Sequence, residues 1–512
     1  MTKLVHTMKT ALRVAAWLVL TIVAGCASPA RAPEDALQVL DKAAAAMGGW
    51  DTLNRITRQE IQSSGVDWEP LQTSEPTAEP RQINSFKQAI LVDYRKHRLR
   101  LTFDAARTYP TAAPVKFVEV IDGDTGMLES NKERLHPSRL ATRLRDYNRM
   151  PIRLLQVAKN ASDLRVEGGI LKYTDSGLPV QLQFDSQTGL PLRVIYMEDD
   201  PIFGDTPNEL SYSDWHDWGE VRLPRTQITK LDGKKIREER IESVTTDPPL
   251  DEAAFAIPES VRTQPENGER IVSQWVLRRV VMGVAYLDYG RTQKIELVDV
   301  AAGIVHIRGG SHHSMAIEMK DHLIVVEAPL FDERSVAVIS ALEGRFPGKP
   351  IKHLVLTHFH FDHSGGVRAY VAKGATVVVH EAIVPFTEEM ISRPHTLRPD
   401  SLAKLATAPA ARIQAVGDLS TLTDGERVVE LRAVPNDHAA GMIIAYLPRE
   451  QVVFVSDLYS PPGPVSNPSV IFERTRAAAF RGALAKQRLE VRTIVGGHGI
   501  AGPLRDLDNA LR

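Results

Sequence analysis

The C-terminal half of the chain alternates short apolar runs with polar segments that are rich in histidine and aspartate. Each of four such runs has the length of a buried strand and is followed at once by residues that bind metals well. The runs are 353–356, 428–434, 451–456 and 491–495, and the residues that follow them are His358, His360, Asp362, His363, His438, Asp457 and His498. Because α/β sheets place their sites at the C-terminal ends of strands, we expect these side chains to gather at one sheet edge.

The N-terminal half has a different texture, in which strand-length segments are separated by turn signals. A periodic apolar pattern predicts a helix over 36–47, which Gly48 and Gly49 end. The predicted strands are 89–94, 99–103, 116–121, 170–173, 180–184, 192–197, 222–231 and 236–244. They indicate a large antiparallel sheet, with the Pro-rich segment Glu69 to Pro80 as a surface loop.

The first 25 residues follow the layout of a secretory signal peptide. Lys3, Lys9 and Arg13 precede an apolar stretch over 15–23 that is too short to span a bilayer comfortably. The stretch ends in Val-Ala-Gly-Cys26, which resembles a bacterial lipoprotein processing box. The resemblance implies lipid attachment at Cys26, with an outer-membrane tether because alanine and not aspartate follows. An ordinary signal peptide or an N-terminal membrane anchor remains the alternative.

Composition narrows the chemistry. The net charge of −2 gives no sign of a nucleic-acid surface. Cys26 is the single cysteine, so an internal disulfide and a cysteine-based zinc site are both excluded. Imidazole with carboxylate is the ligand set that zinc takes when one position stays open for catalysis.

With these ligands in view, residues 295–512 resemble the metallo-β-lactamase fold hydrolases, whose motif order and approximate spacing the histidines and aspartates follow. The resemblance implies a first metal on His358, His360 and His438. It implies a second metal on Asp362, His363 and His498, with Asp457 between the two. Asp362 would also be the catalytic carboxylate that orients the nucleophilic hydroxide. Glu327 stands where aspartate is commoner in the family, which leaves the support behind the metal loop open.

The resemblance also orders the alternatives for the reaction. Because it has an aspartate at position 457, the chain resembles glyoxalase II, lactonases and phosphodiesterases more than the true β-lactamases. Diiron electron-transfer relatives favour glutamate where this chain has His360, whereas mononuclear-iron dioxygenase relatives keep a similar pattern. We therefore expect two zinc ions, with iron or manganese as alternatives.

Several other residues attract attention but have simpler explanations. His312 and His313 follow two glycines and are expected in a solvated turn, with a place at the pocket mouth as the alternative. His380 ends a predicted strand and is expected to be structural. Two further groups are noted. The segment 391–401, with Arg393 and His395, is expected as a loop over the site, and Trp215 and Trp218 are expected in the core or at a sheet edge.

Together these patterns predict an α+β two-domain chain with an N-terminal antiparallel β-rich domain and a C-terminal αββα sandwich. The expected parts are a signal peptide (1–25), a tether (26–34), the β-rich domain (35–262), a linker and helix (263–294, the helix at 270–286) and the metallo-β-lactamase fold domain (295–512). The β-rich part loosely resembles the half-barrels of bacterial lipoprotein carriers. The expected function is metal-dependent hydrolysis of an ester-type carbonyl, meaning a thioester, lactone or amide of a small molecule, in the periplasm-facing envelope. The alternatives are an iron-dependent dioxygenase of the same fold and a non-enzymatic lipid-binding lipoprotein.

Overall fold

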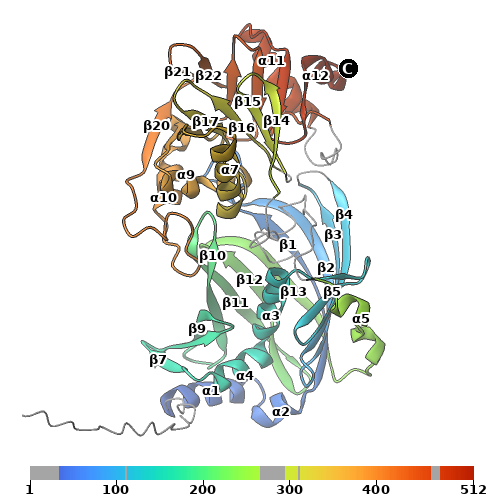
Figure 1. The fold of residues 1–512 in the computed structure, drawn as a ribbon. Coiled ribbons are helices and arrows are strands. Elements are labelled where there is room, and N and C mark those ends of the chain that lie inside the picture. The colour runs from blue at the N-terminus through green and yellow to red at the C-terminus, as the bar shows by residue number, and fades with distance from the viewer. Residues whose placement is uncertain (1–33, 110–111, 266–293, 310–311, 463–472) are drawn as a thin grey trace, which may run out of the picture.

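The computed structural model describes residues 34–109, 112–265, 294–309, 312–462 and 473–512. The predicted signal peptide, Cys26 and the predicted helix at 270–286 lie outside the described residues. None of the helices in the described ranges is both long and apolar enough to cross a membrane. Two sheet-containing parts, one from each half of the chain, pack against each other (Figure 1).

The N-terminal part is built on one curved antiparallel sheet of 13 strands in the order β6-β5-β4-β3-β2-β1-β13-β12-β11-β10-β9-β8-β7. Most neighbours are consecutive hairpins, and the pairing of β1 with β13 joins the two halves of the sheet. The strands are β1 (Arg58–Glu69), β2 (Arg81–Asp93), β3 (Arg98–Arg107), β4 (Ala113–Asp122), β5 (Thr125–Leu128), β6 (Glu133–Arg134), β7 (Arg165–Glu167), β8 (Ile170–Asp175), β9 (Leu178–Phe184), β10 (Pro191–Asp200), β11 (Gly204–Trp218), β12 (Val221–Leu231) and β13 (Lys234–Thr246).

Helices complete the core of this part, because one face of the curved sheet is apolar and needs a cover. Leu40, Ala43 and Ala44 of the first helix are fully buried against the sheet in the same core as Leu154 and Leu155. The helical elements are α1 (Glu34–Ala46), α2 (Trp50–Arg55), α3 (Pro137–Asn148), α4 (Pro151–Asn160), η1 (Glu252–Phe255) and α5 (Glu259–Arg262). The predicted antiparallel sheet and first helix are therefore confirmed.

The C-terminal part is a sandwich of two mixed sheets covered by helices on both outer faces. One sheet has the order β14-β15-β16-β17-β18-β19-β20 and the other β21-β22-β23-β24-β25-β26. The strands are β14 (Glu296–Ala301), β15 (Ile304–Arg308), β16 (Ser314–Glu318), β17 (Leu323–Val326), β18 (Ile351–Val355), β19 (Thr376–His380), β20 (Arg412–Val416), β21 (Leu419–Thr423), β22 (Val428–Ala433), β23 (Ile443–Leu447), β24 (Val452–Val455), β25 (Thr493–Gly496) and β26 (Ala501–Pro503).

Apolar side chains define the layers of the sandwich. A core between the two sheets joins residues such as Val326, Val355 and Phe454. The helices are α7 (Asp332–Arg345), α8 (Phe361–Ser364), α9 (Val367–Ala372), η2 (Glu381–Ile383), α10 (Val384–Ser392), α11 (Arg474–Lys486) and α12 (Leu504–Leu511). Helices α7 and α9 pack on the outer face of the first sheet, and helices α11 and α12 pack on the outer face of the second. The order of layers is therefore αββα, as predicted.

A single apolar core crosses from one part to the other. Leu71, Ile202 and Phe203 of the N-terminal part belong to the same buried cluster as Phe331 and Ile391 of the C-terminal part. Polar contacts reinforce it, since the amide of Asp205 donates to the carbonyl of Pro394 over 2.7 Å. The segment 391–401, which we expected over the metal site, makes these contacts with the turn between β10 and β11. The two parts are thus packed together rather than joined by the chain alone.

Candidate metal centre

The first group of candidate ligands lies on a tight loop between β18 and α9. The strand ends at Val355, and the turn is packed so closely that the backbone leaves no space for a side chain at Gly365 or Gly366. A Cβ at Gly365 would overlap the carbonyl oxygen of Leu330, and one at Gly366 would overlap Ser335. The Ser-Gly-Gly sequence is therefore a requirement of the loop, and the loop holds His358 to His363 at the end of the parallel strands, as the pattern predicts.

The structure brings all seven predicted ligands together with one further histidine. Their nitrogen and oxygen atoms form two four-residue groups, within each of which every ligand atom lies within 4.8 Å of the others. The groups are His358, His360, His438 and Asp457, and His312, Asp362, His363 and His498. A third, overlapping group contains Glu327, His358 and His363. All eight side chains of the first two groups are buried.

Asp457 lies between the two groups. Its Oδ2 is 3.0 Å from Nε2 of His438 in the first group, whereas its Oδ1 is 3.0 Å from Nε2 of His498 in the second. The Oδ1 atom is also 2.9 Å from Nε2 of His363. One carboxylate therefore faces both groups, which is the arrangement that a ligand shared by two metals requires.

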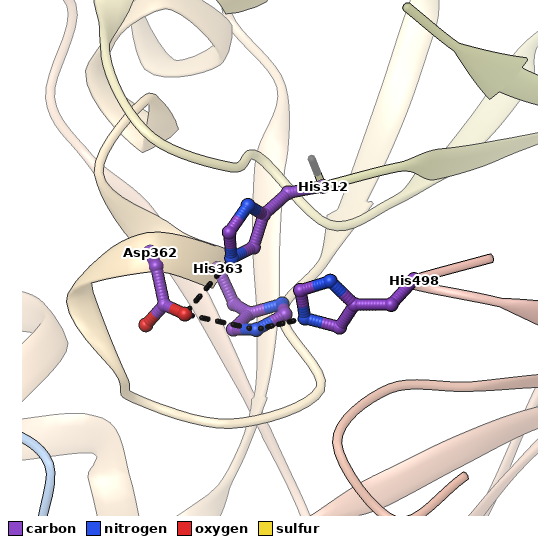
Figure 2. A group of neighbouring side chains, drawn as sticks. All are labelled: His312, Asp362, His363 and His498. Carbon is purple, nitrogen blue, oxygen red and sulfur yellow. Dashed lines mark hydrogen bonds and ion pairs between the residues drawn. The ribbon is translucent and has the colours of Figure 1, made fainter. Parts of the chain in front are cut away.

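His312 is the site residue that we did not expect. It was predicted in a solvated turn, but it is fully buried, and its Nε2 lies 2.9 Å from Oδ2 of Asp362. Figure 2 shows the ring pointing toward Asp362, His363 and His498. The neighbouring amide of His313 donates to the carbonyl of Gly497 over 2.7 Å, which fixes the turn beside the strand end that carries His498. Two histidines just before the buried strand β16 were the signal in the sequence.

Glu327 supports two candidate ligands from behind. Thr357 donates its hydroxyl to Oε1 of Glu327 over 2.6 Å, and the same hydroxyl oxygen lies 2.9 Å from Nδ1 of His358. Oε2 of Glu327 accepts from Nδ1 of His363 over 2.9 Å. The φ angle of Glu327 is 72°, in the left-handed region that costs energy for a residue with a side chain. The glutamate thus provides the support that the sequence left open.

The N-terminal part also reaches the site. The side-chain amide of Gln72 donates to Oδ1 of Asp362 over 2.9 Å, and Nε2 of His360 donates to the carbonyl of Thr73 over 2.9 Å. Both residues lie in the segment 69–80, which we expected to be a surface loop. Gln72 is instead fully buried. The expectation was therefore wrong for residues 69–73, which are buried, and right for residues 74–80, which are exposed or half-buried. A Pro-rich composition marks a turn but says nothing about what packs against it.

Burial and neighbouring charges set the protonation of the cluster. Burial, with the charge of His438, lowers the pKa of His360 to about 3, and burial with the charge of His498 lowers the pKa of His312 to about 3. Burial opposes charge on His363 as well, but Asp457, Glu327 and Asp362 raise its pKa well above the usual value. Against burial, the charges of His363 and the hydrogen bond from His312 hold the pKa of Asp362 well below its usual range.

This donor set fits a pair of divalent metal ions. Two buried ring nitrogens, Nε2 of His358 and Nδ1 of His360, have no hydrogen-bond partner among the described residues. Buried polar atoms are normally satisfied, so orphaned nitrogens beside two buried carboxylates call for positive charge. The two groups offer eight nitrogen and oxygen donors, and neutral imidazole with ionised carboxylate is the form that binds zinc-class metals.

The remaining singled-out residues lie elsewhere. Nδ1 of His380 accepts from the amide of Ala382 at the turn after β19, which agrees with a structural role. His395 is buried, with its Nδ1 3.5 Å from Oδ1 of Asp199 in the N-terminal part. Trp215 and Trp218 are half-buried and pack against the core of the N-terminal sheet, as expected.

Comparison with known proteins agrees with this geometry. Residues 307–498 match the family model of the metallo-beta-lactamase superfamily, whose members are typically hydrolytic enzymes. A curated relative, the alpha subunit of 2,4-dinitroanisole O-demethylase from Nocardioides sp. (strain JS1661), is 25% identical over 151 residues. The match covers 30% of this chain and 42% of that protein, so the chain spans less than half the length of that relative.

Similar solved structures cover the C-terminal part. A metallo-beta-lactamase from Pontibacter korlensis is 17% identical, covers 43% of this chain and 97% of its own, and has a TM-score of 0.34. A metallo-beta-lactamase from Pseudomonas aeruginosa in its mono-zinc form is 17% identical over 42% of this chain and 93% of its own, with a TM-score of 0.32. A flavodiiron protein from Giardia intestinalis is 15% identical over 43% of this chain and 58% of its own, with a TM-score of 0.33.

Proposed function

We propose that this chain, which carries a metallo-beta-lactamase superfamily domain in residues 307–498, is a metal-dependent hydrolase with two metal ions. The observation that supports the proposal is the pair of adjacent, fully buried donor groups with Asp457 between them. His358, His360 and His438 would hold the first ion. Asp362, His363 and His498 would hold the second ion. We add His312 to this set because its Nε2 lies 2.9 Å from Oδ2 of Asp362.

The protein supplies the orientation and the proton acceptors for this chemistry. A bound metal pair supplies an activated water and polarises the carbonyl under attack. Asp362 is held ionised, so its carboxylate accepts hydrogen bonds at neutral pH and is our candidate for the group that orients the attacking water. Glu327 and Thr357 fix the rings of His363 and His358 from behind, so the donors are in place before a substrate arrives.

The substrate that fits best is a small molecule with an ester-type carbonyl, meaning a thioester, a lactone or an amide. The donors are buried, and the N-terminal part contacts them through Gln72 and Thr73. We further propose that zinc is the metal, that Cys26 carries a lipid, and that the enzyme faces the periplasm from the outer membrane. These last proposals rest on the sequence patterns at the N-terminus and on the nitrogen-rich donor set.

Elemental analysis of a soluble form that begins after Cys26 tests the metal centre. We expect about two zinc ions per chain in the wild type and a large loss in His360→Ala. His380→Ala removes a histidine of the same domain outside the donor groups and should leave the metal content unchanged. An ester, thioester, lactone and β-lactam screen then tests the reaction. One iron per chain would move the chemistry to the dioxygenase alternative, and no metal would overturn the proposal.

A cavity in the N-terminal part favours a second function, the binding of an apolar small molecule. It has a volume of about 390 Å³ and lies between the strands and helix α3. Its walls combine apolar side chains such as Ile61, Ile90 and Leu101 with a large set of charged ones, among them Arg149 and Glu198. Such a mixture suits an amphiphile with one polar end. Saturable binding of a fluorescent fatty acid, weakened in Leu101→Trp, would support this function, and no binding would overturn it.

A further inference from the structure

The loop between β1 and β2 is the part of the N-terminal sheet that lies nearest the metal centre. It joins two long strands of the sheet and contains Leu71, Gln72 and Thr73, whose exposed fractions are 2%, 0% and 6%. A hairpin loop of this length normally lies in water. The burial of these three residues means that the first part of the loop is packed into the C-terminal part, where it contacts candidate ligands from both groups.

Gln72 is fixed so that it can only donate to Asp362. Tyr109 donates its hydroxyl to Oε1 of Gln72 over 2.8 Å, which leaves the amide nitrogen to face Oδ1 of Asp362 at 2.9 Å. The reverse orientation of the amide would place its oxygen against an ionised carboxylate. Oδ2 of Asp362 is left for the metal side, where it lies near His312 and His363. Gln72 therefore occupies Oδ1 and leaves Oδ2 as the oxygen that would be available to a bound metal.

Thr73 fixes the tautomer of His360. A carbonyl oxygen can only accept, so the ring nitrogen Nε2 must carry the proton that it shares with Thr73 over 2.9 Å. The neutral ring then has its lone pair on Nδ1, which has no partner among the described residues and faces the first group of donors. Metal-binding histidines are commonly oriented in this way through their other nitrogen.

The loop is anchored beyond these two contacts. The amide of Ala440, on the segment that carries His438, donates to the carbonyl of Ser74 over 2.7 Å. Arg81 donates to the carbonyl of Gln72, and its guanidinium lies 4.7 Å from the centroid of the Tyr109 ring. Leu71 belongs to the core that the two parts share. The position of Gln72 is therefore set by both parts of the chain.

We propose that Gln72 and the Thr73 carbonyl are positioning groups of the metal centre, so that the N-terminal part completes a site whose ligands all come from the C-terminal part. The inference rests on the metal-binding half of the proposed function and is independent of the reaction. Changes to such outer partners typically lower metal affinity about 10- to 100-fold. We expect that loss for the second ion when Gln72 is replaced.

The test is a competition titration of the metal-free full-length protein with zinc against a chromophoric chelator, together with the absorption spectrum of the cobalt form. Gln72→Leu keeps the volume but removes the donor, and we expect about 10- to 100-fold weaker binding of one ion and an altered cobalt spectrum. Tyr109→Phe, which frees the amide of Gln72 to rotate, should give a smaller loss.

Gln59→Leu is the matched control. Gln59, in β1, is likewise a buried glutamine that accepts from a tyrosine, with Oη of Tyr94 2.6 Å from its Oε1, but it makes no hydrogen bond to a candidate ligand in the described part of the chain. Zinc affinity should stay at the wild-type value in this variant. Affinity within twofold of the wild type in Gln72→Leu, or an equal loss in Gln59→Leu, overturns the inference. Zinc binding by the wild type without any hydrolysis would contradict the proposed reaction and leave this inference standing.

Discussion

Glu327 is the residue on which the rear side of the metal centre depends. Because it accepts from Thr357 and from Nδ1 of His363, replacing it removes the charged acceptor that these two buried donors share. We expect Glu327→Gln to lower zinc affinity about tenfold through loss of charge behind His363. Glu327→Ala should also destabilise the protein by about 1–3 kcal/mol. Chelator competition and urea unfolding measure the two effects, and Glu343→Gln on the exposed face of α7 is the control.

His306 makes a separable contribution to acid sensitivity. It is fully buried in β15, with Nε2 3.0 Å from the carbonyl of Gly496. Burial lowers its pKa to about 4, against the hydrogen bond to Gly496. In the unfolded chain the group binds a proton below about pH 6.5. Its contribution to stability is therefore complete above that pH and is lost as the pH falls toward 4.

The expected size of this effect is about 2 kcal/mol between pH 7 and pH 5. Urea unfolding of chelator-treated protein at the two pH values measures it. His306→Phe should lose about that much less stability than the wild type over the same interval. Equal losses in the two proteins would show that His306 takes up its proton in the folded state and would contradict the assigned pKa.

Local sequence predicts the residues of this site only where ligand and strand are neighbours in the chain. The seven expected ligands each follow an apolar strand, so their spacing pointed to a common edge. The sequence did not identify His312 and Gln72 as site residues, because their partner, Asp362, is distant in sequence. Nothing in the neighbouring residues distinguishes a buried polar side chain from a solvated one. Burial of such groups becomes favourable only through the hydrogen bonds that the folded chain provides.

At the scale of elements, the turn between β10 and β11 carries a large share of the contact between the two parts. Gly204 has a φ angle of 66°, and a Cβ there would overlap the carbonyl oxygen of Pro394. Gly204→Ala should therefore be strained by its backbone and also displace Pro394. We expect a loss of more than about 2 kcal/mol in urea unfolding, beyond the roughly 1–2 kcal/mol of the left-handed backbone alone.

Gly123→Ala separates these two effects. Gly123 has a φ angle of 62°, but a Cβ there would meet none of the described atoms within 4 Å. This variant should lose only the backbone contribution of about 1–2 kcal/mol. If the two variants lose the same stability, the contact between Gly204 and Pro394 adds nothing.

Alternation of apolar and polar residues located most strands of the N-terminal sheet but not all of them. The eight predicted strands each overlap an observed strand, whereas the long strands β1 and β11 were missed. In β1 the inward positions include Gln59, Ser63 and Asp67, which are buried and polar. Gly65 in the same strand leaves space for the ring of Phe86. A strand that buries polar groups in pairs has no apolar stripe for pattern reasoning to find.

For the whole molecule, the shared core predicts that metal binding in one part stabilises the other. The six tryptophans all lie before the metal domain, at Trp17, Trp50, Trp68, Trp215, Trp218 and Trp275. Tryptophan fluorescence therefore follows the N-terminal part. Zinc at about 100 times its dissociation constant adds about 2.7 kcal/mol to the folded state. We expect this to raise the unfolding temperature that fluorescence reports.

A variant of the interface tests the coupling. Phe203→Ala removes a buried ring from the shared core and should reduce the shift that zinc produces in tryptophan fluorescence. Leu155→Ala, in the separate core of the N-terminal sheet, should lower stability but keep the shift. An unfolding temperature that does not respond to zinc in the wild type would mean that the two parts unfold independently.

The shared core also has a consequence for how the chain is made. All strands of the N-terminal sheet have been synthesised once Thr246 is added, yet partners of Leu71, Ile202 and Phe203 such as Phe331 and Ile391 are translated later. Synthesis proceeds at roughly 5–20 residues per second, so the apolar end of that sheet stays exposed to water on the order of tens of seconds. A nascent chain that stalls in this interval exposes apolar surface through which it can associate with other chains. We therefore expect it to need protection from aggregation until the C-terminal part has folded onto this surface.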